Sequence, residues 1–320
     1  MLLERERELD VVSGALAGAC EGEGSFVLVE GETGVGKSRL LLAAEDRAFD
    51  LDMTTLAARG TELDADLPFG VVIQLLERLV TAMPRPERDE LLEGRAKMAA
   101  PLFPALRKAG EPAAEDPLAL VHGVYWLIAR IAELRPLLIT VDDAQWMDER
   151  SLQVIRYLAG RVEDLPIALV AAGTSRVDDL ARHALPVRLR LRPLSGDGVA
   201  RVVLAEFPDA DAEFCAACAQ ASAGVPLLLS ELLAAVRTND LAPTGETTAG
   251  FERLGLREVA RAVLSRLEAL PPGTPVVART AAVLGDDAEL HYVARLAQLS
   301  LHDAAMALDA LCASGIVEPD

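Results

Sequence analysis

The stretch that decides the fold is FVLVEGETGVGKSRLL, residues 26–41. A short apolar run leads into glycines and then into a helix-forming segment, which is typical of a buried parallel strand, a phosphate-binding loop and a helix. Gly31, Gly36, Lys37 and Ser38 meet the pattern G-x-x-x-x-G-K-[ST]. The sequence therefore predicts a nucleotide-binding loop at residues 31–38.

The chemistry of such a loop assigns roles to its residues. Successive backbone N–H groups converge on a phosphate at the N-terminus of a helix, whose dipole favours an anion. We expect Lys37 to reach the β- and γ-phosphates and the Ser38 hydroxyl to bind Mg²⁺. The residues expected to bind the nucleotide here are Gly31, Glu32, Thr33, Gly34, Val35, Gly36, Lys37, Ser38 and Arg39.

A second apolar run, PLLITVDD at 136–143, ends in two acids. Asp142, at the tip of this predicted strand, can hold Mg²⁺ through water, and Asp143 is placed to orient or deprotonate an attacking water. Two acids after an apolar run are also typical of a helix N-cap. The phosphate loop earlier in the chain favours the catalytic interpretation.

A third apolar run, PIALVAAG at 166–173, is followed by Thr174, Ser175 and Arg176. In a sheet that binds its nucleotide at the carboxyl ends of the strands, a hydroxyl and a guanidinium here would lie near the γ-phosphate. The alternative is that Arg176 is a solvated loop residue.

Apolar strands alternate with helical segments over the first part of the chain. This alternation predicts an α/β fold with a parallel sheet and helices on both faces. The likeness of the loop to that of P-loop NTPases implies the strand order of that fold, 5-1-4-3-2. The expected strands are 25–30, 53–60, 136–143, 166–176 and 186–194.

After residue 195 the strand patterns stop. Three helical segments predict a small bundle, a stretch rich in Thr, Gly and Pro predicts a linker, and four short helices with a final GIVEP strand resemble part of a winged-helix unit. The expected domains are an NTPase domain at 1–194, the bundle at 195–240, the linker at 241–254 and the winged-helix-like unit at 255–320.

Composition excludes several classes of protein. The net charge of −19 argues against nucleic-acid binding by these 320 residues alone. The N-terminus, MLLERERELD, does not resemble a signal peptide. The longest apolar segment, 118–134, contains His, Arg and Glu and is better interpreted as a buried helix. We expect a cytoplasmic protein that does not bind membranes.

Cys215 and Cys218 form a CxxC motif in AEFCAACAQASAG. A metal or redox site is one interpretation. The segment is an alanine-rich helical pattern with no second pair and no flanking histidine, so two small apolar residues on one helix face are the favoured interpretation.

Taken together, these segments resemble a STAND-type NTPase, the signal-transduction branch of the AAA-like ATPases. More narrowly, they resemble the N-terminal ATPase region of the large ATP-binding regulators of the LuxR family. The resemblance extends in family order over nearly the whole chain. It is carried by LLERERELDVV, VLVEGETGVGKSRLL, RGTELDADLPFGVVIQLLERL, LLITVDDAQWMDERSLQVIRYLAGR, LRPLS and GVPLLLSELL.

The resemblance implies ATP or ADP with Mg²⁺ as the ligand and roles for three residues after the strands. Asp142 would bind Mg²⁺ and Asp143 would be the catalytic acid. Arg176 would be the sensor that contacts the γ-phosphate. ATP hydrolysis to ADP and phosphate is the implied reaction.

Two further segments match family motifs. The GVP at 224–226 corresponds to the GxP element, so Pro226 would pack on or near the adenine and link nucleotide state to the helical bundle. Arg5 would occupy the arginine of the N-terminal hhGRxxE motif, in which Glu4 replaces the family's glycine.

Relatives of this kind continue into a sensor region and a LuxR-type helix-turn-helix that binds promoter DNA. The sequence stops at GIVEPD, before either. We expect a piece of a longer regulator, which contacts DNA only through that C-terminal helix-turn-helix. Its expected function is a switch that hydrolyses ATP slowly and self-associates in the ATP state. The alternatives are an ATPase module coupled to a kinase or cyclase effector, and a dedicated ATPase motor.

Overall fold

The protein is described by a computed structural model, which falls into two compact units. The first comprises Met1–Gly31 and Lys37–Leu191, and the second comprises Glu32–Gly36 and Arg192–Asp320. The chain therefore passes into the second unit and back again inside the predicted phosphate loop. The residues that the structure describes are 2–61, 67–103, 116–181, 184–238, 241–245, 270–271, 273–284, 290–313 and 317.

The first unit is built on a parallel sheet. Its strands lie in the order β2-β3-β4-β1-β5, and each neighbouring pair is parallel. Read from the other edge, this order is the predicted 5-1-4-3-2, so the α/β fold and its strand order are confirmed. The strands are β1 (Ser25–Glu30), β2 (Thr54–Arg59), β3 (Leu137–Asp142), β4 (Ile167–Gly173) and β5 (Val187–Arg190).

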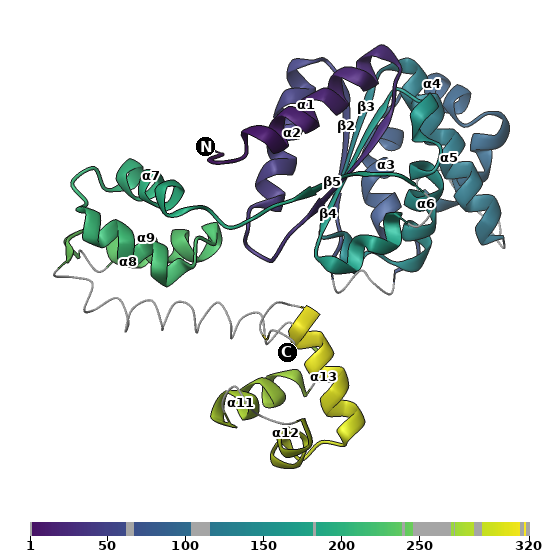
Figure 1. Cartoon of the computed structure of the whole chain (residues 1–320). Helices are drawn as coiled ribbons and strands as arrows, with labels where there is room; N and C mark the ends of the chain where they lie inside the picture. Colours follow the sequence, from purple (N-terminus) through teal and green to yellow (C-terminus); the bar gives the residue numbers. More distant parts are fainter. Residues whose placement is uncertain are drawn as a thin grey trace. The chain divides into compact units, whose positions relative to one another are not determined.

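Helices cover both faces of this sheet (Figure 1). The three inner strands β1, β3 and β4 are apolar on both sides, as expected for strands of a parallel sheet that are buried on both faces, whereas the edge strands β2 and β5 are partly exposed. One face carries α1 (Glu6–Glu21) and α2 (Lys37–Asp50). The other carries α3 (Gly70–Ala82), α5 (Pro117–Leu134) and α6 (Glu149–Ala159), with α4 (Arg85–Leu91) and the 3-10 helix η2 (Gly94–Leu102) beside α5.

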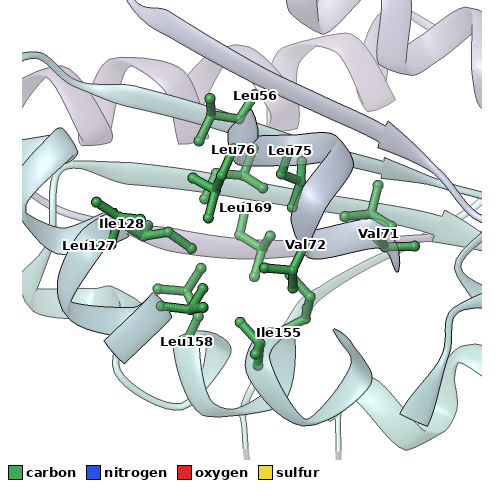
Figure 2. Packing of buried hydrophobic residues seen from close by; sticks show 14 of the residues in the cluster. Leu56, Val71, Val72, Leu75, Leu76, Leu127, Ile128, Ile155, Leu158 and Leu169 are labelled. Atoms are coloured by element: carbon green, nitrogen blue, oxygen red, sulfur yellow. The ribbon is translucent and has the colours of Figure 1, made fainter. Parts of the chain in front are cut away.

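The larger apolar core lies between the sheet and the helices α3, α5 and α6 (Figure 2). Leucine, isoleucine and valine side chains from these helices meet side chains of the strands. Burying each such side chain stabilises the fold by about 1.5–3 kcal/mol. Contributors include Leu56 and Leu169 from the strands, and Leu76, Leu127 and Ile155 from the helices. The core fixes the strands on which the candidate site lies.

Within the described residues, α5 is the one helix that is long and apolar enough to cross a membrane by length and composition. Half of its apolar window is buried inside the protein, and Leu127 and Ile128 are fully buried against the sheet. The segment 118–134 is therefore a core helix, as its sequence predicts.

One buried aspartate connects the starts of two helices. The Oδ1 atom of Asp148 accepts hydrogen bonds from Arg150 N at 3.1 Å and Ser151 N at 2.9 Å, which caps α6. The same atom accepts a hydrogen bond from Phe69 N at 2.8 Å, immediately before α3. Asp148 is only 3% exposed. The segment that follows β3 thus holds α3 and α6 together.

The second unit contains two sets of helices, each with its own apolar cluster. The six helices within the described residues of this unit coincide with helical segments predicted from the sequence. The predicted helix at 257–270 and final GIVEP strand lie largely outside the described residues, and the division at 241–254 stays a prediction. The helices are α7 (Gly196–Glu206), α8 (Ala212–Ser222) and α9 (Pro226–Thr238), then α11 (Thr274–Leu284), α12 (Leu290–Ala297) and α13 (Leu301–Ala313).

The CxxC cysteines lie on α8 and belong to the apolar cluster of α7, α8 and α9. Burial raises the pKa of both thiols, and that of Cys218 rises to about 12. The thiolate is the reactive form of cysteine, and burial disfavours it here, which is consistent with two apolar packing residues on one helix face. In the described part of the chain, no group of three or more His, Cys, Asp or Glu residues could hold a metal ion.

The shared cap predicts a large cost for removing Asp148. We expect Asp148→Ala to lower the free energy of unfolding by about 3 kcal/mol, because several backbone N–H groups lose a buried acceptor. Thermal unfolding should show a melting temperature about 6–12 °C lower. Glu149→Ala, at the exposed neighbouring position, is the control. Equal melting temperatures for the two variants would contradict the role of Asp148.

Candidate functional site

The loop between β1 and α2 has the backbone geometry that a phosphate loop requires. Gly34 has a φ of 85° and Gly36 a φ of 106°, which lie in the left-handed region that favours glycine. Val35 is buried, whereas Glu32 and Thr33 are exposed. The helix α2 begins directly after the loop at Lys37, so its positive dipole end faces the same place.

Lys37 folds back over the loop. Its Nζ atom donates a hydrogen bond to the carbonyl oxygen of Gly31 at 2.8 Å, and the residue is only 7% exposed. A buried ammonium needs acceptor oxygens around it, and phosphate oxygens would satisfy the same donors. Ser38 and Arg39 occupy the exposed first turn of α2.

The other predicted site residues lie at the same edge of the sheet. The N–H of Gly31 donates to the carbonyl of Gly173 at 3.3 Å, which joins the end of β1 to the end of β4. Asp142 is the last residue of β3, and β4 lies between β3 and β1. Because all these strands are parallel, the structure brings Gly31, the two acids and Thr174 to one edge of the sheet.

The two acids differ in their surroundings. The Oδ1 atom of Asp142 accepts a hydrogen bond from Asp143 N at 2.9 Å. Asp143 has a φ of 48°, and its Oδ2 atom accepts hydrogen bonds from Arg59 Nε at 2.8 Å and Nη2 at 2.7 Å. This bond first, and then the charge of Asp143, raise the pKa of the Arg59 guanidinium. Arg59 and Asp143 therefore form an ion pair.

Gln145 contacts the other oxygen of Asp143. Its Nε2 atom donates to Asp143 Oδ1 at 3.1 Å, and its Oε1 atom accepts from Thr174 N at 3.2 Å. Sequence reasoning missed both Arg59 and Gln145 as site residues. Both stand in segments that carry the family resemblance, but nothing in their spacing connects them to Asp143.

The strand that leads to Arg176 ends earlier than predicted. Expected to extend to residue 176, β4 stops at Gly173, and the 3-10 helix η6 (Ser175–Ala181) follows. The backbone N–H of Thr174 bonds to Gln145 instead of continuing the strand. Arg176 lies in η6, and its contact with a γ-phosphate stays a prediction.

The GxP segment contacts the tip of the phosphate loop within the second unit. The N–H of Leu227 donates to the carbonyl of Gly34 at 3.2 Å. A Cβ atom on Gly34 would lie 2.8 Å from Leu227 Cβ, so a glycine is required for this approach. Gly224 has a φ of 73° and accepts a hydrogen bond from Leu194 N at 2.8 Å. Pro226 begins α9, and its contact with adenine stays a prediction.

The N-terminal motif has a distinctive backbone. Glu4 has a φ of 56°, in the left-handed region, which gives a physical reason for the family's glycine at this position. Arg5 is only 4% exposed and donates a hydrogen bond from Nη1 to the Glu4 carbonyl at 2.8 Å. The role of Arg5 in nucleotide binding stays a prediction.

Comparison with protein families decides the class. A family model described as the AAA ATPase domain matches residues 1–170, which is more than half of the chain. The chain belongs to the AAA ATPase domain family. This membership supports ATP binding at residues 31–38 and ATP hydrolysis as the associated reaction.

One curated relative of this AAA ATPase is the uncharacterized protein R02095 of Rhizobium meliloti (strain 1021). It is 27% identical over 350 aligned residues, which cover 99% of this chain and 33% of the relative. The chain thus spans about a third of the length of the curated relative that it matches.

Solved structures share the fold. The Walker-type ATPase PABY2304 of Pyrococcus abyssi has a TM-score of 0.65 at 16% identity and covers 100% of this chain and 92% of its own. The ORC1 protein of Aeropyrum pernix, solved in complex with DNA, has a TM-score of 0.57 at 18% identity and covers 99% and 85%. At these identities the likeness establishes the fold alone.

The loop geometry predicts that one lysine dominates nucleotide binding. We expect Lys37→Ala to weaken ATP binding about a hundredfold or more, because a buried charge that pairs with phosphate is lost. Titration calorimetry would measure the affinity. Lys97→Ala, at an exposed lysine on η2, is the matched control and should bind ATP like the wild type. Retained affinity in Lys37→Ala would contradict the assignment of the loop.

Proposed function

We propose that this AAA ATPase is a STAND-type regulatory switch, which binds ATP and hydrolyses it slowly to ADP and phosphate. In the whole protein it would be the N-terminal ATPase region of a bacterial transcriptional regulator of the LuxR family. The family-ordered segments of the sequence support this proposal. The observation that carries it is the contact between the phosphate-loop tip at Gly34 and the first turn of α9 at Leu227.

That contact suits a switch because the loop segment proposed to bind phosphate is the same segment that contacts the start of α9. Residues Glu32–Gly36 group with the helices of the second unit, whereas Gly31 and Lys37 group with the sheet. A nucleotide that binds the loop differently with and without its γ-phosphate would favour different arrangements of α9. A ligand shifts such an equilibrium only by its differential affinity for the two states.

The proposed hydrolysis uses groups at the carboxyl edge of the sheet. Asp143 would orient the attacking water and accept its proton, and Arg176 would contact the γ-phosphate. Ser38 and Asp142 would hold Mg²⁺. One hydroxyl and one carboxylate fit this ion, which usually takes few protein ligands and completes its shell with phosphate oxygens and water. When bound, Mg²⁺ supplies neutralisation of phosphate charge.

The proposed partners follow from charge and from the switch. We propose that the ATP state self-associates and that the protein acts in the cytoplasm. With a net charge of −19, these residues would be repelled by DNA. Promoter contact would therefore be made by a helix-turn-helix outside the 320 residues.

The nucleotide that the protein retains tests the switch. We expect denatured protein to release stoichiometric ADP, and ATP turnover to take minutes or longer, since a switch must persist in each state. Asp143→Asn should bind ATP but not hydrolyse it, whereas Asp164→Asn, at an exposed position, should keep wild-type turnover. An empty site with many turnovers per second would favour a dedicated ATPase motor instead.

The GxP contact predicts a variant that separates binding from switching. In Pro226→Ala we expect ATP affinity within about threefold of the wild type, while the difference in protease sensitivity between ATP and ADP states shrinks. Pro117→Ala is the matched control, because Pro117 also begins a helix. If Pro226→Ala retains the full difference between nucleotide states, Pro226 does not couple the nucleotide to the bundle.

A further inference from the structure

Both carboxylate oxygens of Asp143 accept hydrogen bonds, and the donors come from opposite directions along the chain. Arg59 at the end of β2 donates twice to Oδ2, and Gln145, in the 3-10 helix η4 (Ala144–Trp146), donates once to Oδ1. These bonds fill both lone-pair sites of Oδ2 and one of the two on Oδ1, so a water can bind Asp143 at the remaining site of Oδ1, beside Gln145, or at Oδ2 when Arg59 leaves it. Which donor fixes the carboxylate therefore matters for any reaction there.

Of the two contacts to Asp143, the one from Arg59 is the more easily broken. Its side chain is 66% exposed, against 23% for Asp143. An ion pair with one long, solvated partner is screened by water and loses side-chain entropy when it forms. Arg59 can leave Oδ2 for solvent at little cost, which would expose that oxygen to a water molecule.

The side-chain amide of Gln145 is held by a hydrogen bond at each end. Its amide nitrogen binds Asp143 and its amide oxygen binds the main-chain N–H of Thr174. The backbone beneath it is glycine, and a Cβ atom at Gly173 would lie 2.6 Å from Gln145 Oε1. The Gln145 amide can therefore lie this close to the main chain only because residue 173 is a glycine.

The main chain of Asp143 leaves the side chain to be oriented by its neighbours. Its backbone lies in the left-handed region, with a φ of 48°, and its N–H is already bonded to Asp142 Oδ1. With the backbone constrained in this way, the direction of the carboxylate is set by what binds its two oxygens. Gln145 is the donor that is itself anchored.

We propose that Gln145 is a positioning residue for Asp143. Its amide N–H donates to Asp143 Oδ1, and its amide oxygen accepts from Thr174 N, which follows β4. Gln145 thus links the Asp143 carboxylate to the turn that leads into η6, the 3-10 helix that contains Arg176. A movement of the turn at Thr174 would therefore move the Gln145 side chain, and with it the Asp143 carboxylate that orients the water. The inference rests on the proposed function, in which Asp143 acts on the attacking water.

The sharpest test changes the donor and keeps the size. Gln145→Glu preserves an oxygen for Thr174 N but replaces the N–H that faces Asp143 with a second oxygen. We expect kcat for ATP to fall about tenfold or more, as part of the contribution of a general base. The KM and the affinity for ATP should stay within about twofold, because the hydrogen bonds of the Gln145 side chain go to Asp143 and Thr174 and not to the residues proposed to bind the nucleotide.

Two further variants separate positioning from folding. Gln145→Ala removes both hydrogen bonds without adding charge and should lower kcat with little change in KM. Gln220→Glu makes the same chemical change at an exposed glutamine of α8 and should match the wild type. Melting temperatures of all variants would be measured alongside kcat and KM.

The outcomes distinguish this proposal from the one on which it rests. If Asp143→Asn abolishes hydrolysis while both Gln145 variants keep wild-type kcat, the positioning role is overturned. A joint change in kcat, KM and melting temperature would also overturn it, because that pattern marks a structural residue. If Asp143→Asn itself hydrolyses ATP at the wild-type rate, Asp143 is not catalytic. The hydrolysis step of the proposed function is then overturned, and the positioning role of Gln145 falls with it.

Discussion

The pairing of β1 with β4 is the constraint on which the rest of the site depends. Every residue of β4 is buried, and its register places Glu30 opposite Gly173. The next amide, Gly31 N, bonds to the Gly173 carbonyl, so the phosphate loop starts where β4 ends. Because β3 pairs with the other edge of β4, the acids at the end of β3 lie at the same edge of the sheet as Gly31. An apolar core formed by residues far from the site thus determines where its polar groups meet.

Much of this arrangement follows from local sequence patterns. The loop motif and the acids after β3 could be predicted because each depends on a short segment with a known physical preference, and the strand order followed from the resemblance to P-loop NTPases. The contacts of Asp143 could not. Its bond to Arg59 joins residues 84 positions apart, and its bond to Gln145 depends on side-chain rotamers. The end of β4 was misplaced for a related reason, since Thr174 N bonds to a side chain that no strand pattern reveals.

The phosphate loop illustrates how a motif can serve two parts of a chain. Lys37 bonds to Gly31 beside the sheet, whereas Gly34 bonds to Leu227 at the start of α9. Glycine at position 34 therefore satisfies two requirements, a left-handed turn and close approach of a helix. The first requirement is evident from the motif. The second becomes evident only when residues nearly two hundred positions later fold against the loop.

The shared cap at Asp148 has a consequence for the dynamics of the first unit. Phe69 and Ser151 donate to the same carboxylate oxygen, and Val72 N bonds to Ser151 Oγ at 3.2 Å. The first turns of α3 and α6, 79 positions apart in the sequence, cannot fray independently, because opening one exposes the buried acceptor of the other. Local opening should therefore involve both helix starts as one cooperative unit, with common protection of their amides from hydrogen exchange. The short segment between Asp143 and the start of α6 should therefore be rigid as well.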